Sequence, residues 1–154
     1  MKTEPETFGW QDLVTRPQRR ESWEGVRNYQ ARNFMRDDFM EDQQVFIYHS
    51  STAEPAIVGI ARVVKAAHPD PTALIPDSPY FDPKSAKAGA SRWVMVDVEA
   101  LATFEPAITL KRLREEPLLA GMALLQRGQR LSIQPIQKDE WETICHMARL
   151  IPVL

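Results

Sequence analysis

The alternation of apolar and polar positions predicts several short strands. In residues 45–50 successive side chains point to opposite faces, so His49 and its neighbour Ser50 face in different directions. The same alternation in VMVDV places three valines on one face and Trp93, just before them, on the more polar face. The strands predicted in this way cover residues 45–50, 56–64, 92–101 and 130–135.

Apolar residues three and four positions apart predict short helices between these strands. Gly9, Asn28 and Thr109 each precede such a pattern and can cap the helix that follows. Residues 1–7 contain Pro5 and are expected to be extended. The predicted apolar helix faces consist of Trp10, Leu13 and Val14, of Ala31, Phe34 and Met35, of Leu110 and Leu113, and of Trp141, Ile144, Cys145 and Ala148.

The order of these elements is mixed and shows no regular alternation of strand and helix. Such an order predicts an α+β fold, with a strongly curved sheet or small barrel of about five strands and short helices packed around it. The chain has 154 residues, 44% of them hydrophobic, so residues 1–154 are expected to form one domain with a sizeable core. Five prolines in residues 68–83 predict a long loop.

The charge of the chain is acidic overall but locally basic. A net charge of −2 argues against a protein that coats nucleic acid or a membrane by bulk charge. Between Arg16 and Arg36, however, there are six arginines and only two acidic residues, so a polyanion would meet a local patch. A single cysteine, Cys145, and the lack of a signal peptide or a long apolar segment indicate the cytoplasm as the expected location.

Common catalytic and metal-binding motifs are absent from the sequence. There is no glycine-rich phosphate loop, no nucleophile elbow and no pair of cysteines or histidines with zinc spacing. His49 and Ser50 cannot act as a base and a nucleophile in a regular strand, so a histidine placed by packing or a backbone hydrogen bond is the preferred interpretation. Cys145 beside His146 makes an incomplete metal site. We therefore predict no catalytic residue, no metal site and no cofactor.

The sequence SWEGVRNYQARN, residues 22–33, has a composition typical of a binding surface. It combines Trp23 and Tyr29 with amide side chains, Asn28 among them, and with arginines. Unstacked bases are held by aromatic stacking and by amide or hydroxyl hydrogen bonds, with arginine or lysine on the phosphates. Further candidates for the walls of a base pocket are Tyr48, Ser50, Tyr80 and Phe81, and the candidate phosphate contacts are Arg19, Arg20, Arg27, Arg32, Lys84 and Lys87.

Each of these residues also has an ordinary structural interpretation. Asn28 alone is more often only a helix cap, Trp23 and Trp93 are more often core residues, and arginines more often cover a solvated face. Two other functions stay open on these residues. One is an enzyme that modifies or cleaves RNA with a base such as His49 or a carboxylate such as Asp82. The other is an interaction module that docks an acidic protein partner.

Eight short sequences in order along nearly the whole chain carry a resemblance to a known family. They are KTEP (2–5), WEGVRNYQARNFMRD (23–37), YHSS (48–51), IVGIARVV (57–64), DPT (70–72), YFDPKS (80–85), RWVMVDV (92–98) and RLSIQP (130–135). Together they resemble the motifs of the EVE domain family. The resemblance implies a PUA-like fold, a curved β pseudo-barrel of about five to six strands with short helices around it. It also implies similarity to YTH domains, which read methylated adenine in RNA, and a non-enzymatic partner of nucleic acid with a modified base, such as a modified cytosine in DNA.

The resemblance also implies roles for single residues. KTEP would line one wall of the pocket through Thr3, where the family more often has serine. The family usually has an aromatic-rich strand before this motif, whereas the present sequence begins one residue ahead of it. The implied base pocket consists of Thr3, Trp23, Asn28, Tyr29, Tyr48, Ser50, Phe81 and Asp82, with Arg27 at its mouth.

Overall fold

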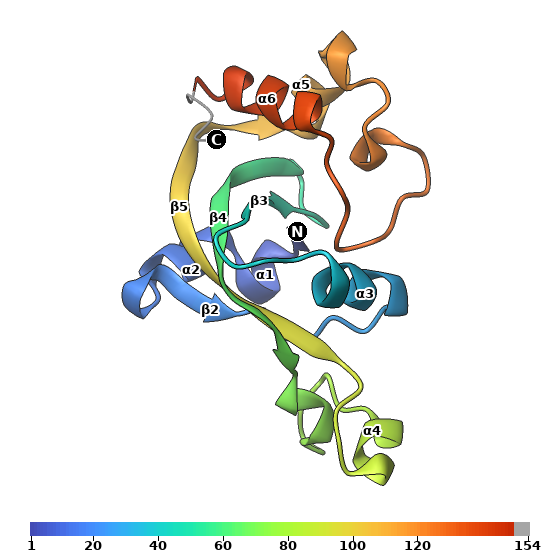
Figure 1. Ribbon diagram of the computed structural model, residues 1–154. Helices are drawn as coiled ribbons and strands as arrows, with labels where there is room; N and C mark the ends of the chain where they lie inside the picture. Colours follow the sequence, from blue (N-terminus) through green and yellow to red (C-terminus); the bar gives the residue numbers. More distant parts are fainter. Residues whose placement is uncertain (150–154) are drawn as a thin grey trace.

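Two long antiparallel strands, β4 (Ala56–Pro69) and β5 (Val94–Thr109), form the centre of the sheet in the computed structural model (Figure 1). β3 (Gln44–His49) pairs with β4 in antiparallel fashion, and β1 (Lys2–Thr3) lies parallel to β3. β2 (Arg20–Ser22) pairs with β5. Within residues 1–149, which are the ones that the structure describes, the sheet has five strands in the order β1-β3-β4-β5-β2.

The sheet is strongly curved, and Figure 1 shows β4 and β5 bent along their length. Their pairing register shifts at several points, as it does at β-bulges, which bend a strand and increase its twist. Gly59 lies at one of these points, where a Cβ atom would be 2.5 Å from the Ala102 carbonyl oxygen and 2.5 Å from the Trp10 ring. The close approach of three elements therefore requires glycine here.

Short helices cover the sheet, and their ends follow local sequence rules. The Asn28 side-chain oxygen accepts hydrogen bonds from the backbone N–H groups of Gln30 and Ala31, so the predicted cap is confirmed. None of the helices within residues 1–149 is long and apolar enough to cross a membrane. The helices are α1 (Pro5–Phe8), α2 (Trp10–Thr15), α3 (Tyr29–Asp37), α4 (Pro83–Ala88), α5 (Leu110–Glu115) and α6 (Lys138–Met147), with 3₁₀ turns η1 (Pro17–Arg19), η2 (Pro71–Leu74), η3 (Pro117–Leu119) and η4 (Ala123–Leu125).

Two hydrophobic clusters hold the helices against the sheet. One contains Met35 and Val96 and packs α2 and α3 against β4 and β5. The other contains Ile108 and Ile144 and packs α5 and α6 near the start of β4 and the end of β5 (Figure 1). Each fully buried aliphatic side chain contributes roughly 1.5–3 kcal/mol relative to an exposed one. The predictions of an α+β fold and a strongly curved sheet are confirmed.

Some predicted elements are wrong. Residues 130–135 form no strand, because the Lys2 N–H donates to the Ser132 carbonyl at 2.8 Å without the repeated bonds of a ladder. Residues 5–8 are helical rather than extended, because Pro5 occupies the first position of α1, where its missing N–H has no partner to lose. Trp93 is buried rather than on a polar face, since it precedes β5 and its Nε1–H donates to Asp82.

The β4–β5 hairpin is longer than predicted. The two strands have 14 and 16 residues, and the predicted loop of residues 68–83 begins within β4, where His68 and Pro69 still pair with β5. The loop also ends at a helix, since Asp82 caps α4 and Gly89 terminates it in the left-handed conformation. The hairpin therefore extends beyond the first hydrophobic cluster and carries a lobe formed by η2 and α4 at its end (Figure 1).

Candidate nucleic-acid interface

The loop of residues 23–28, between β2 and α3, is held by a buried carboxylate. Asp70 is fully buried, and its oxygens accept hydrogen bonds from the Gly25 N–H, the Arg27 guanidinium and the Thr72 N–H, each at 2.9 Å. Burial alone would raise the pKa of Asp70, but hydrogen bonds from Thr72, Gly25 and Arg27 outweigh it and keep this pKa below its ordinary value. The ionised carboxylate thus ties η2 to the loop.

Gly25 and Tyr80 pack so closely that a side chain at position 25 would clash. Gly25 has a φ of +85°, and a Cβ atom there would lie 2.6 Å from the Tyr80 ring. The Arg27 Nε–H donates to the Tyr80 carbonyl at 2.9 Å, and its guanidinium lies 5.7 Å from the centroid of the Tyr80 ring. These contacts fix the Tyr80 ring against the loop.

This loop forms one side of a pocket of about 660 Å³, which we term the charged pocket. Three aromatic residues, Phe8, Trp23 and Tyr80, contribute to its lining. The Phe8 and Trp23 rings meet edge to face at 6.0 Å, and Trp23 is only 9% exposed, so a small part of its surface is open to solvent. The charged pocket is lined by Lys2, Thr3, Glu4, Thr7, Phe8, Arg16, Glu21, Ser22, Trp23, Glu24, Gly25, Val26, Arg27, Asn28, Tyr80, Arg130 and Ser132.

Several of the charged groups in this pocket already have partners. Arg16 pairs with Glu21 at 2.6 Å, and Arg27 pairs with Asp70. In contrast, Lys2 and Arg130 form no ion pair with any residue in the part of the chain that the structure describes. The Lys2 Nζ group donates to the Gln129 carbonyl at 3.3 Å, but no carboxylate among the described residues neutralises its charge or that of Arg130. Both cations can therefore bind an anionic ligand such as phosphate.

Five residues predicted for the site line the charged pocket, namely Thr3, Trp23, Arg27, Asn28 and Tyr80. Arg27, Thr3 and Asn28 also form side-chain hydrogen bonds within the protein. The Thr3 hydroxyl donates to the Phe8 carbonyl at 2.6 Å, and the Asn28 oxygen caps α3, which leaves the Asn28 amide N–H groups for a ligand. Their predicted role in base binding stays a prediction, now with a defined location.

Tyr48 and Ser50 lie outside the lining of this pocket. Tyr48 is buried in the second hydrophobic cluster, and burial raises the pKa of its phenol. Ser50 lies just beyond the end of β3, where its N–H donates to the Thr3 carbonyl at 2.9 Å. A register shift between Ile47 and Tyr48 interrupts the regular alternation that was predicted for residues 45–50.

Phe81 and Asp82 also lie outside the lining and belong to the lobe around α4. Asp82 accepts hydrogen bonds from Arg92 at 2.7 Å, from the Ser85 hydroxyl at 2.6 Å and from Trp93 at 3.0 Å. The Arg92 guanidinium and the Ser85 hydroxyl hold the pKa of this carboxyl well below its usual range. Asp82 therefore fastens α4 to the start of β5.

Tyr29 lies on a separate surface where arginines stack on aromatic rings. Its ring is 49% exposed and stacks on Trp93, with 4.8 Å between the centroids. The guanidinium groups of Arg32 and Arg92 lie 4.8 Å and 5.4 Å from the Tyr29 ring centroid. Arg32 also donates to the Arg92 carbonyl and to the Asn33 side chain, so much of its hydrogen-bonding capacity is used within the protein.

The other predicted phosphate contacts are spread over the surface. Arg20 pairs with Glu99 at 2.8 Å across β2 and β5. Arg19 is exposed in η1, and Lys84 and Lys87 are exposed on α4. None of these four side chains lines the charged pocket.

His49 and Cys145 have structural surroundings. The His49 Nε2 atom accepts a hydrogen bond from the Trp10 N–H at 3.0 Å, and burial lowers its pKa, so the interpretation as a histidine held by a backbone hydrogen bond is confirmed. Cys145 is buried on the apolar face of α6, and burial raises the pKa of its thiol. Within residues 1–149 no group of three or more histidine, cysteine, aspartate or glutamate side chains is arranged to hold a metal ion.

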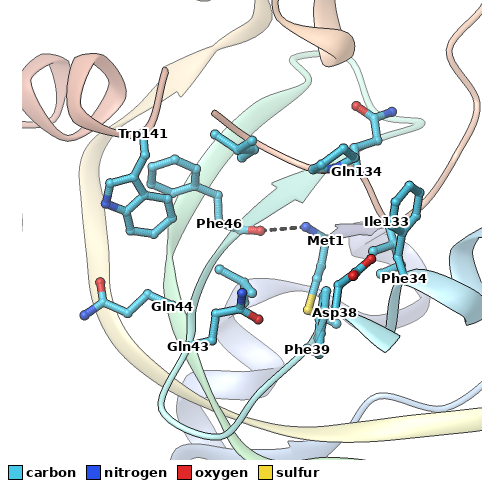
Figure 2. A pocket seen from close by; sticks show the side chains of 13 residues that line it. Met1, Phe34, Asp38, Phe39, Gln43, Gln44, Phe46, Ile133, Gln134 and Trp141 are labelled. Carbon is cyan, nitrogen blue, oxygen red and sulfur yellow. Dashed lines mark hydrogen bonds between the residues drawn. The ribbon is translucent and has the colours of Figure 1, made fainter. Parts of the chain in front are cut away.

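A second pocket, of about 250 Å³, adjoins the charged pocket and is termed the aromatic–glutamine pocket. Figure 2 shows the stacked rings of Phe46 and Trp141, whose centroids are 3.9 Å apart, and the Met1 amino group that donates to the Phe46 carbonyl at 2.8 Å. Its lining contains no lysine or arginine side chain. The pocket is lined by Met1, Phe34, Asp38, Phe39, Gln43, Gln44, Val45, Phe46, Ile133, Gln134, Pro135, Ile136 and Trp141.

Sequence reasoning missed Lys2, Glu24 and Arg130 as pocket residues. Lys2 and Arg130 occur within KTEP and RLSIQP, two of the motifs that carry the family resemblance. The occurrence of Lys2 and Arg130 in these two motifs was the only sign in the sequence that they could belong to the site. In the structure, the hydrogen bond from the Lys2 N–H to the Ser132 carbonyl brings the two motifs together. Glu24 occurs in the WEGVRN motif, where only the aromatic, amide and basic residues had been considered.

Comparisons with known proteins agree with this fold. The chain is 37% identical to mouse thymocyte nuclear protein 1 over 169 residues, which covers 99% of this chain and 74% of the mouse protein. It resembles the crystal structure of the human THYN1 protein in complex with 5-methylcytosine-containing DNA with a TM-score of 0.90 and 36% identity, covering 99% of this chain and 97% of that one. A crystal structure of a protein from Pseudomonas syringae gives a TM-score of 0.89 at 40% identity, covering 96% and 97% of the two chains.

The relatives named thymocyte nuclear protein 1 are named for the nucleus, so the comparisons give no support to the predicted cytoplasmic location. The family model described as the EVE domain matches residues 1–147. This match spans nearly the whole chain and includes every motif on which the resemblance was based. The chain therefore belongs to the EVE domain family.

Proposed function

We propose that this protein is a non-enzymatic module that binds DNA containing a modified cytosine and holds the modified base in the charged pocket. The observation that carries the proposal is the similarity to the human THYN1 protein in complex with 5-methylcytosine-containing DNA, at a TM-score of 0.90 over 99% of this chain. The size of the charged pocket, about 660 Å³, supports it, since sites for small ligands span roughly 300–1,000 Å³.

The chemistry of the pocket also supports capture of an unstacked base. Moving a base out of the helix costs a few kcal/mol, and stacking on an aromatic side chain returns roughly 1–3 kcal/mol per base. Phe8, Trp23 and Tyr80 supply aromatic surface, and Lys2 and Arg130 supply cations for the flanking phosphates. So few free cations predict a mild dependence of affinity on salt.

A non-enzymatic role is supported by the surroundings of the two groups considered as catalytic bases. His49 Nε2 is already an acceptor for the Trp10 N–H, and the Asp82 carboxylate is bound by Arg92, Ser85 and Trp93. A general base has to be free to accept a proton from the substrate. Neither side chain lines the charged pocket.

The test is a binding series with duplexes that carry one cytosine, 5-methylcytosine or 5-hydroxymethylcytosine at the same position, followed by fluorescence anisotropy. We expect tighter binding of 5-methylcytosine than of cytosine by about fourfold, because one buried methyl group contributes about 0.8 kcal/mol. Equal affinity for cytosine and both modified bases would refute the proposal.

Variants locate the binding pocket. Trp23→Phe keeps an aromatic ring in the core but reduces the surface available for stacking, so it should weaken binding several-fold. Trp141→Phe makes the same change in the aromatic–glutamine pocket and should leave affinity unaltered. Circular dichroism of both variants checks that the fold is intact. A larger loss of affinity in Trp141→Phe than in Trp23→Phe would place the site in the other pocket.

A further inference from the structure

Glu24 differs from the other acidic residues of the charged pocket. Glu21 pairs with Arg16 at 2.6 Å, and Glu4 accepts a hydrogen bond from the Ser51 hydroxyl at 3.2 Å. The Glu24 carboxylate has no hydrogen bond or ion pair within the described residues, and the residue is exposed at the pocket. It is therefore a free hydrogen-bond acceptor in the pocket wall.

The backbone on both sides of Glu24 is fixed. The Trp23 N–H donates to the Val96 carbonyl at 2.7 Å, and the Gly25 N–H donates to the buried Asp70 carboxylate at 2.9 Å. The Glu24 N–H donates to the Ser22 carbonyl at 3.1 Å. A carboxylate on a loop held at three consecutive residues is preorganised, so a ligand that binds it loses little free energy in ordering the loop.

The electrostatic surroundings of Glu24 favour a donor as its partner. Partial desolvation at the pocket wall raises the pKa of Glu24, the negative charges of Asp70 and Glu21 raise it further, and Arg27 opposes the change. A ligand N–H group placed here would relieve the repulsion among the carboxylates. A ligand carbonyl oxygen would add to it, because an ionised carboxylate only accepts hydrogen bonds.

We infer that Glu24 is a specificity-determining residue that accepts a hydrogen bond from the exocyclic amino group of the captured base. This inference rests on the proposed function, and it assigns to Glu24 the selection of cytosine bases over thymine. Cytosine presents an amino donor where thymine presents a carbonyl acceptor, and carboxylates accept from the cytosine amino group. 5-Methylcytosine and thymine carry the same methyl group, so they differ only along this hydrogen-bonding edge.

The experiment compares two oligonucleotide duplexes that differ only in 5-methylcytosine or thymine at one position. The opposite strand carries an abasic site, so that neither base has a pairing partner to lose when it leaves the helix. Wild-type protein should bind the 5-methylcytosine duplex about tenfold or more tightly than the thymine duplex. In Glu24→Gln, the amide N–H can donate to the thymine carbonyl, so this ratio should fall to within about twofold of equality.

Glu54→Gln is the matched control, because it removes the same charge from an exposed residue outside the pocket lining. It should leave the ratio at the wild-type value. If the ratio is unchanged in Glu24→Gln, the proposed role of Glu24 is wrong. If the wild type still prefers 5-methylcytosine over cytosine in the same duplex context, the proposed function nevertheless stands. Equal affinity of the wild type for cytosine, 5-methylcytosine and 5-hydroxymethylcytosine overturns both proposals. Circular dichroism of Glu24→Gln confirms that the ratio is measured on folded protein.

Discussion

The charged pocket and the aromatic–glutamine pocket lie on two sides of the same pair of chain segments. Lys2 and Ser132 contribute to the first pocket, whereas their neighbours Met1 and Ile133 contribute to the second. Successive residues of an extended chain point in opposite directions, so each segment supplies a side chain to both pockets. The pair of segments thus acts as a shared wall with one polar and one apolar side.

The two sides differ in charge more than in aromatic content. The charged pocket has seven charged side chains in its lining, whereas the aromatic–glutamine pocket has one, Asp38. Burial, with a smaller contribution from Lys2, lowers the pKa of the Met1 amino group to about 5, so this group is neutral near pH 7. Aromatic rings occur in both pockets, and therefore they do not identify a base site without the cations and the polar network beside them.

The largest expected effect comes from removing the network that shapes the charged pocket. Asp70→Ala leaves the Arg27 guanidinium and the Gly25 N–H without their acceptor, and it should lower the free energy of unfolding by about 3–5 kcal/mol and abolish DNA binding. Urea unfolding and anisotropy measure the two effects. A loss of less than about 1 kcal/mol would contradict a structural dependence on this carboxylate.

The same carboxylate predicts a dependence of stability on pH. The pKa of Asp70 in the folded protein is below its ordinary value, so its ionised form stabilises the fold above the unfolded pKa of about 3.9. This contribution is lost as the pH falls through the folded pKa. Urea unfolding as a function of pH should show a smaller acid-induced loss in Asp70→Ala than in the wild type, and equal losses would contradict the assignment.

A smaller effect, on stability alone, is expected in the second pocket. Trp141→Ala removes the ring that stacks on Phe46, and because Trp141 is only half-buried we expect a loss of about 2–3 kcal/mol, below the usual range for a buried tryptophan. DNA affinity of the folded fraction should not change. If Trp141→Ala changed the preference for 5-methylcytosine over cytosine, the aromatic–glutamine pocket would also contribute to base binding.

Gly25→Ala tests the packing of the loop against Tyr80. The left-handed conformation and the clash with the Tyr80 ring should together cost about 1–3 kcal/mol of unfolding free energy. The double variant Gly25→Ala/Tyr80→Ala removes the clash but keeps the backbone strain. Thermal unfolding should therefore show non-additive losses, and simple additivity would mean that the two residues do not interact in solution.

The smallest effect on stability is expected at the free cation Arg130. Arg130→Ala should leave the unfolding free energy unchanged within about 0.5 kcal/mol and should lower the slope of log affinity against log salt by about 1. The reduction in affinity should be the same for cytosine and 5-methylcytosine duplexes, since a phosphate contact carries no base information. Arg127→Ala, at an exposed arginine outside the pocket lining, is the control.

Helix caps were predictable because they depend on only a few neighbouring residues. Asn28 and Thr109 both accept hydrogen bonds from backbone N–H groups of the helix that follows, as their positions in the sequence indicate. Trp93 was not predictable in this way, because its burial depends on Asp82 in another segment. The absence of a strand at residues 130–135 was not predictable either, because it depends on how these residues meet Lys2, with which Ser132 forms one isolated backbone hydrogen bond.

The candidate site was predictable in part. The motif around Trp23 and Asn28 indicated the loop, but Tyr48 and Asp82, which also belong to family motifs, point to other parts of the fold. A family motif contains residues that line a pocket as well as buried residues that stabilise the fold, and the motif alone does not distinguish the two. Lys2 and Arg130, the pocket cations without an ion pair among the described residues, became apparent only once the partners of the other arginines were known.

The sequence by itself determined the α+β class, the caps and apolar faces of the short helices, the family and the loop at which a ligand was expected, because these depend on local spacing or on motifs read in order. Only the tertiary structure decided which charges remain available. Arg27 is bound by Asp70, 43 positions away in the chain, while the Glu24 carboxylate beside it has no partner among the described residues. Charge pairing depends on distances in space that a linear sequence does not specify.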